Sequence, residues 1–95
     1  MPNLEGMSAL RVAVADDSVL LREGLVRVLR DAGVEVVGAY GDAEALLAAV
    51  PELQLDAVVL DVRMPPTFRD EGVRAAIELR RRHPAVAILL LSQYV

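Results

Sequence analysis

The sequence predicts a single α/β domain built on a parallel β-sheet, and two observations support this prediction. Short apolar runs alternate with segments whose apolar residues recur at helical spacing, which gives the order β-α-β-α-β-α-β along the 95 residues. The apolar runs lack the alternation of half-exposed strands and are typical of strands covered by helices on both faces. Such an order favours right-handed β-α-β units and therefore parallel strands.

The first unit is expected to begin with a buried strand at residues 12–15 (VAVA). Asp17 and Ser18 follow and offer a helix N-cap. The helix after them is indicated by apolar residues at helical spacing, namely Leu21, Leu25, Val28, Leu29 and Ala32. Gly33 stands where the glycine that ends a helix is expected.

The remaining units follow the same scheme. They are expected as a strand at 34–39, a helix at 43–50, a strand at 56–61, a helix at 71–82 and a strand at 85–92. Pro51 should end the second helix because proline lacks the amide donor that a helix interior needs. Pro65 and Pro66 should keep the segment before the third helix irregular. In that helix Val73, Ala76 and Ile77 are expected to face the core.

The folded domain is expected to span residues 10–95, preceded by a loose leader at residues 1–9. Whether Met7 is a second start, or the first residues are foreign to the protein, stays open. The N-terminus lacks the basic start and apolar centre of a signal peptide, and no apolar stretch reaches the ~18 residues that span a membrane.

Composition limits the classes of function. The chain is 55% hydrophobic and only 3% aromatic, so its core must consist of Val, Leu, Ile and Ala. Its net charge of -4 argues against a nucleic-acid surface on this chain, although it allows a DNA-binding domain elsewhere in a longer protein. The absence of cysteine excludes disulfides, thiolate zinc sites and cysteine nucleophiles, and fits a cytoplasmic protein.

Polar side chains stand where three of the predicted strands end. Asp16 and Asp17 follow the first strand, Asp61 ends the third and Ser92 ends the fourth. The carboxyl ends of parallel strands share one edge of a sheet, where ligands bind in open α/β folds. If the first and third strands are neighbours, three carboxylates converge there, and a hard cation such as Mg²⁺ would relieve their repulsion.

A structural interpretation of these acids must be weighed as well. A single Asp after a strand is usually a helix cap or a loop residue, and for Asp17 alone capping of the first helix is the more frequent outcome. Here two separate strands both end in Asp and a third ends in a hydroxyl residue. Independent caps or loop residues explain this combination less well than a shared site does. The pattern therefore favours a magnesium site.

Three segments together resemble the receiver domain of two-component response regulators. They are VADDS at 14–18, VVLDVRMP at 58–65 and LLLSQ at 89–93, and the resemblance runs from Arg11 to Val95. It implies a flavodoxin-like sheet with strand order 2-1-3-4, incomplete because the fifth strand and last helices of a receiver are missing. The flanking sequence looks most like regulators that carry a helix-turn-helix output domain.

The resemblance also implies roles for individual residues. Asp61 would be the phospho-acceptor, taking a phosphoryl group from a sensor histidine kinase. Mg²⁺ would be bound by Asp16, Asp17, Asp61 and the backbone carbonyl of Arg63, and Ser92 would contact the phosphoryl group. The domain would be a regulatory switch rather than an enzyme, controlling transcription and touching DNA only through an output domain absent from this chain.

The sequence departs from the family pattern in three places. The glycine that soon follows the Met-Pro pair in the family is delayed to Gly72, so the loop after Asp61 is longer and Thr67 and Arg69 are expected near the phosphate entrance. Gln93 replaces a residue that is often small. The family's phosphate-binding lysine is absent, since all ten cationic residues are arginine, and its segment would lie beyond Val95.

Two other classes of function stay open beside the signalling switch. One is a metal-dependent phosphohydrolase or nucleotide-binding fragment, although neither G-x-x-x-x-G-K-[ST] nor G-x-G-x-x-G occurs. The other is a non-phosphorylated pseudo-receiver that serves as an interaction module. In any of them, an apolar fourth strand at the edge of the sheet would favour self-association of the chain.

Overall fold

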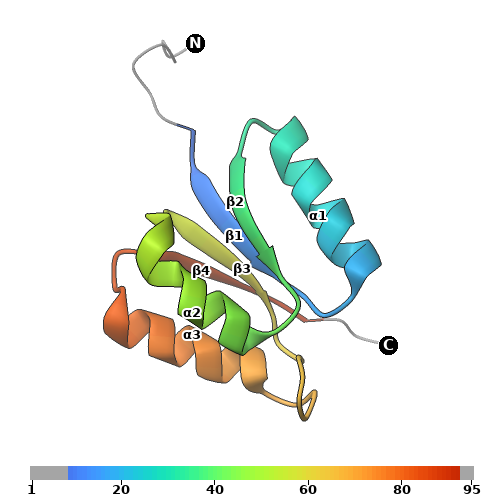
Figure 1. The fold of residues 1–95 in the computed structure, drawn as a ribbon, viewed down its shortest axis with the longest axis vertical. Coiled ribbons are helices and arrows are strands. Elements are labelled where there is room, and N and C mark those ends of the chain that lie inside the picture. The colour runs from blue at the N-terminus through green and yellow to red at the C-terminus, as the bar shows by residue number, and fades with distance from the viewer. Residues whose placement is uncertain (1–8, 93–95) are drawn as a thin grey trace.

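The computed structural model describes residues 9–92 and shows four parallel strands flanked by helices (Figure 1). The elements are β1 Arg11–Ala15, α1 Val19–Asp31, β2 Glu35–Tyr40, α2 Ala43–Leu53, β3 Ala57–Asp61, α3 Glu71–Arg82 and β4 Ala87–Leu91. The strand order is β2-β1-β3-β4, with every neighbouring pair parallel. The predicted class, element order and strand order are confirmed.

Helices cover the two faces of the sheet unequally (Figure 1). α2 and α3 lie on one face, where Ala13 and Leu60 of the central strands pack with Leu46 and Leu79. α1 lies on the other face, where the core is smaller and made mainly of valines. The chain thus leaves β1 toward one face and β3 toward the other, which is the topological switch point of a doubly wound sheet.

The helix α1 has the predicted bounds but buries none of its residues completely. Ser18 is its N-cap and accepts a hydrogen bond from the amide of Leu21 (3.3 Å). Gly33 follows the C-cap residue with φ of 89°, the left-handed conformation that glycine adopts without strain. The prediction for Gly33 is therefore confirmed.

None of the helices within residues 9–92 is long and apolar enough to cross a membrane.

The prediction that Pro51 ends α2 is wrong, because the helix continues to Leu53. The guanidinium of Arg11 donates hydrogen bonds to the carbonyls of Leu53 (2.9 Å) and Gln54 (3.2 Å). These bonds satisfy acceptors that a helix end leaves without partners. The last turn is thus held by a residue of β1, and the missing amide of Pro51 is tolerated at an exposed position.

Two predictions in the C-terminal half also need correction. β4 begins at Ala87 rather than at residue 85, because Val86 donates a backbone hydrogen bond to His83 (3.0 Å) that closes a turn. In α3 the buried residues are Gly72, Ala75 and Leu79, whereas Ile77 is exposed. The face of α3 that meets the core is therefore rotated from the predicted one.

Candidate functional site

The pairing of β1 with β3 brings their last residues together. The register pairs Val14 with Val59 and Ala15 with Leu60. Asp16 and Asp61 are therefore the next residues after the last pair of these two strands. Side chains alternate between the faces of a strand, and these two aspartates follow the valines of the α1 face at a spacing of two. Both carboxylates consequently reach the same side of the same sheet edge.

Three carboxylates form one acidic cluster at this edge, composed of Asp16, Asp17 and Asp61. Each offers an oxygen atom, and these oxygens lie within 4.8 Å of one another. Asp16 and Asp61 are buried, with 2% and 7% of their surfaces exposed, while Asp17 is open to solvent. The convergence expected from the sequence is therefore present in the fold.

The turn from β1 into α1 is fixed by Asp16. Its Oδ1 atom accepts a hydrogen bond from the amide of Ser18 (2.9 Å), and its backbone carbonyl accepts one from Nη1 of Arg22 (2.8 Å). The N-cap of α1 is Ser18, so the capping role weighed for Asp17 is not what the structure shows. Asp17 instead leaves its carboxylate at the surface of the acidic cluster.

Arg22 is a residue of this site that the sequence did not single out. It lies one turn into α1, on a helix for which the sequence analysis considered only the apolar positions. Its contact with the Asp16 carbonyl is made across the β1–α1 turn. The available signal was a cation one helical turn after an acidic pair, which is too common on helix surfaces to be specific.

Burial of Asp61 raises its pKa, and the negative charges of Asp16 and Asp17 raise it further. The amide of Arg63 donates a hydrogen bond to Asp61 Oδ1 (3.2 Å) and opposes part of that rise. The carboxylate is therefore held near like charges without a compensating side-chain cation among the described ion pairs. Hard oxygen donors in this arrangement fit Mg²⁺, which binds through one or two carboxylates and keeps several waters.

The two other predicted site residues are Arg63, close to Asp61 in sequence, and Ser92, which follows the strand paired with β3. Arg63 is exposed, two residues beyond Asp61, and its amide points back to that carboxylate. Leu91 pairs with Asp61 in the β3–β4 register and accepts a hydrogen bond from the amide of Val62 (3.0 Å). Ser92 directly follows Leu91 and is exposed, so β4 delivers a hydroxyl to the same edge of the sheet.

The longer loop after Asp61 is organised differently from the expectation. Thr67 donates both its amide (2.7 Å) and its hydroxyl to the carboxylate of Glu71, at the start of α3. The amide of Arg69 binds the same carboxylate (3.0 Å). Thr67 is thus bound to the first turn of α3, and the expected place of Thr67 and Arg69 near the phosphate entrance stays a prediction. Gln93 lies outside the described residues.

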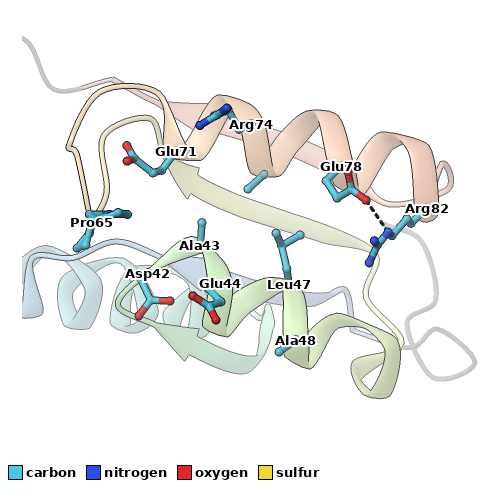
Figure 2. Close-up of a pocket in the computed structure, with 12 residues that line it drawn as sticks. Asp42, Ala43, Glu44, Leu47, Ala48, Pro65, Glu71, Arg74, Glu78 and Arg82 are labelled. Atoms are coloured by element: carbon cyan, nitrogen blue, oxygen red, sulfur yellow. Dashed lines mark ion pairs between the residues drawn. The ribbon is translucent and has the colours of Figure 1, made fainter.

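A separate groove of about 810 Å³ lies between α2 and α3 and is lined by none of the three aspartates (Figure 2). Its floor is apolar, with Leu47 on one wall and Ala75 on the other, and an ion pair between Glu78 and Arg82 (2.5 Å) closes one rim. The acidic cluster lies outside this groove, with two buried carboxylates and the exposed carboxylate of Asp17.

Comparison with known proteins identifies the family and the fold of the chain. The model of the response regulator receiver domain family matches residues 12–95, and the chain belongs to this family. Its sheet and helices superpose on the isolated receiver domain of RcsB from Salmonella enterica serovar Typhimurium with a TM-score of 0.81 and 26% identity. That match covers 92% of this chain and 64% of the RcsB domain.

The curated relatives that match the chain are longer proteins. The chain is 39% identical to a protein-glutamate methylesterase/protein-glutamine glutaminase of Anaeromyxobacter dehalogenans, matching 97% of this chain and 25% of that protein. It is 36% identical to the transcriptional regulatory protein PdtaR of Mycobacterium tuberculosis, matching 87% and 40%. It is 37% identical to the response regulator GacA of Pseudomonas viridiflava, matching 87% and 38%. The chain therefore spans less than half the length of these relatives.

Proposed function

We propose that the chain is the phospho-acceptor domain of a two-component response regulator, with Asp61 as the residue that is phosphorylated. The observation that carries the proposal is the acidic cluster, in which a buried strand-end carboxylate faces two further carboxylates within 4.8 Å. Membership of the receiver family supports this assignment, as do RcsB structures described with the phosphomimetic BeF₃⁻.

In the proposed reaction an Oδ atom of Asp61 attacks the phosphorus of a phosphohistidine on a sensor kinase. The new bond is the oxygen–phosphorus bond of an acyl phosphate. The bond that breaks joins phosphorus to the imidazole nitrogen, which leaves with the bonding electron pair and takes up a proton from solvent. The acceptor must be ionised for this attack, and a cation bound beside it would favour the ionised form by offsetting the burial and like charges that raise the pKa of Asp61 in the metal-free protein.

The other residues of the edge position the reacting groups. Asp16, Asp17, Asp61 and the carbonyl of Arg63 would hold Mg²⁺, which supplies positive charge against the phosphoryl oxygens and relieves the repulsion in the acidic cluster. Ser92 would donate its hydroxyl to a phosphoryl oxygen from the neighbouring strand end. The burial of Asp16 and the hydrogen bond that its Oδ1 atom accepts from the Ser18 amide would keep this carboxylate fixed during transfer.

Phosphorylation would add ~2 negative charges at one edge of the sheet and so bias the loops around it. The consequence would be control of an output domain that is not in this chain. PdtaR is described as a transcriptional regulatory protein, and RcsB has been solved bound to promoter DNA. We therefore place the chain in a cytoplasmic regulator of transcription, with residues 10–95 as its receiver domain after a leader at 1–9.

The test is incubation of the purified protein with a small phosphodonor, with Mg²⁺ or with a chelator. Labelling should require Mg²⁺ and should be lost in Asp61→Asn. Asp70→Asn is the matched control, because Asp70 precedes α3 and its side chain makes no capping hydrogen bond. Labelling that persists in Asp61→Asn contradicts the acceptor assignment, and continuous turnover of the donor without a stable adduct favours a phosphohydrolase instead.

A further inference from the structure

The loop of residues 62–70 joins the acceptor strand to α3 and has little packing of its own. Met64 is fully buried and anchors its first half. Residues 66–70 are all exposed, and Phe68 at the tip has half of its surface in solvent and a φ of 58°. A segment this exposed needs hydrogen bonds to keep one conformation, because apolar burial does not supply the ordering free energy.

One side chain provides most of these bonds, and it is Glu71 in the first turn of α3. Its Oε2 atom accepts the amide of Thr67 (2.7 Å) and the Thr67 hydroxyl, and its Oε1 atom accepts the amide of Arg69 (3.0 Å). Figure 2 shows this carboxylate turned toward the loop rather than across the groove toward Glu44. We call this set of three hydrogen bonds the Glu71 clasp.

The residue that follows the clasp fixes the other end of the loop. The amide of Gly72 donates a hydrogen bond to the carbonyl of Val62 (2.9 Å). A side chain at Gly72 would overlap the backbone carbonyl of Asp61 and come within 2.8 Å of Val62 Cα. The first turn of α3 is thus in direct contact with the backbone of the acceptor.

We propose that Glu71 is a positioning residue of the acidic cluster. By closing loop 62–70 onto the first turn of α3, the clasp fixes the backbone of Val62 and Arg63 beside Asp61, so that a divalent cation meets a prearranged site. The inference rests on the proposed function, because it concerns how well the acidic cluster binds Mg²⁺. The clasp acts through the backbone, and Glu71 itself is not a ligand.

The chemistry of the clasp suits this role. Hydrogen bonds to an ionised carboxylate are stronger than those between neutral groups. The Thr67 hydroxyl and the amides of Thr67 and Arg69 lower the pKa of Glu71 to about 2, so its carboxylate remains charged wherever the protein is folded at moderate pH. A prearranged loop also raises cation affinity, because less conformational freedom is lost when the ion binds.

An acidic residue in the first turn of a helix also stabilises that helix through its dipole, without any effect on a neighbouring site. Two variants separate these roles. Thr67→Val keeps the charge of Glu71 and removes only the hydroxyl donor, whereas Thr67→Ser keeps that donor. Glu44→Ala is the matched control, since Glu44 is likewise an acid in the first turn of a helix and lines the same groove.

The experiment measures Mg²⁺ affinity by calorimetry and amide hydrogen exchange by NMR in the purified protein. In Glu71→Ala we expect exchange at Thr67 and Arg69 to accelerate and the Mg²⁺ dissociation constant to rise roughly tenfold, the scale seen when groups that orient metal ligands are removed. Thr67→Val should show the same effects to a smaller degree. Thr67→Ser and Glu44→Ala should behave as the wild-type protein does.

Faster exchange in Glu71→Ala with an unchanged Mg²⁺ dissociation constant would overturn the inference, and so would a wild-type protein that does not bind Mg²⁺. Circular dichroism shows whether Glu71→Ala keeps its fold. If it does not, the Mg²⁺ dissociation constant of the milder Thr67→Val variant tests the inference. Neither readout requires phosphorylation. If Asp61 is never labelled while Glu71→Ala still weakens Mg²⁺ binding, the proposed function fails and the positioning role stands.

Discussion

Replacement of Asp61 by asparagine is expected to increase the free energy of unfolding of the metal-free protein. The substitution removes one of three negative charges that lie within 4.8 Å of one another, two of them on buried side chains. The asparagine Oδ1 atom still accepts the hydrogen bond from the amide of Arg63, which the carboxylate accepts at 3.2 Å. Repulsion is therefore lost while the local hydrogen bond is kept.

The separation of the charges sets the size of the effect. Two unit charges 4.8 Å apart repel by about 1 kcal/mol in water and about 3.5 kcal/mol at an effective dielectric constant of about 20. Asp61 has one such interaction with Asp16 and one with Asp17, but Asp17 is exposed and its interaction lies near the lower figure. After allowance for solvent screening we expect a gain of roughly 1–2 kcal/mol.

Urea unfolding in a buffer with chelator measures this gain, with Asp70→Asn as the control that should show no gain. The pKa of Asp61 is raised in the folded protein, so its charged form costs stability above that pKa, and the cost disappears as the pH falls through it. The difference between Asp61→Asn and wild type should therefore be largest near neutral pH and shrink in acid. Added Mg²⁺ should stabilise the wild type more than the variant.

A variant less stable than the wild type at about pH 7 in chelator would refute the electrostatic reasoning, because the cluster would then contain no net repulsion to relieve. An advantage that grows in acid would refute it as well. The first result would mean that Asp61 is needed for packing, and the second that its carboxylate is stabilised in the charged form.

Further substitutions test other parts of the edge and the sheet. Asp17→Asn should weaken Mg²⁺ binding and slow phosphoryl transfer while changing stability little, and transfer that continues unchanged in chelator would contradict this. Gly72→Ala should destabilise the protein by about 1–3 kcal/mol because its new methyl group meets the backbone at the end of β3. Gly24→Ala, with open space around it, should be neutral or stabilising. Because Leu89 and Leu90 are exposed on the edge strand β4, the chain should self-associate. Replacing both leucines by threonine should reduce the self-association measured by sedimentation. A wild-type protein that stays monomeric at high concentration would rule out this prediction.

The sequence predicted the position of the site more accurately than it predicted the bounds and buried faces of the helices and strands. Apolar runs that end in carboxylates predicted where the ligand edge lies, because a parallel sheet places all carboxyl ends of its strands together. The sequence predicted this convergence only on the condition that the first and third strands are neighbours. The structure shows that β1 and β3 are paired and that Asp16 and Asp61 follow their last pair. Local pattern and topology agree at this edge.

The errors arose where distant residues decide local structure. Pro51 predicted the end of α2 by its own chemistry, but Arg11, forty-two positions from Leu53, binds the last carbonyls and lets the helix continue. In α3 the predicted inward residues included Ile77, which is exposed, whereas Gly72 approaches the backbone of Asp61 closely and Leu79 is buried. Such contacts leave no periodic signal in the sequence.

The Glu71 clasp was missed for a related reason. Glu71 was read only as the first residue of a helix, a position where acidic residues are common because of the helix dipole. Its partners lie within the preceding loop, whose conformation no propensity describes. A threonine four positions before the glutamate was the available signal, and it becomes informative only once the loop is known to fold back onto α3.

The most direct test of the account is chemical trapping of the phosphorylated residue. The protein is treated with a small phosphodonor and Mg²⁺, reduced with borohydride, which converts an aspartyl phosphate to homoserine, and then mapped by peptide mass spectrometry. We expect homoserine at position 61, in amounts that fall to background when Mg²⁺ is chelated. Homoserine at position 16 or 17 instead, or at no position despite saturating donor and Mg²⁺, would contradict it.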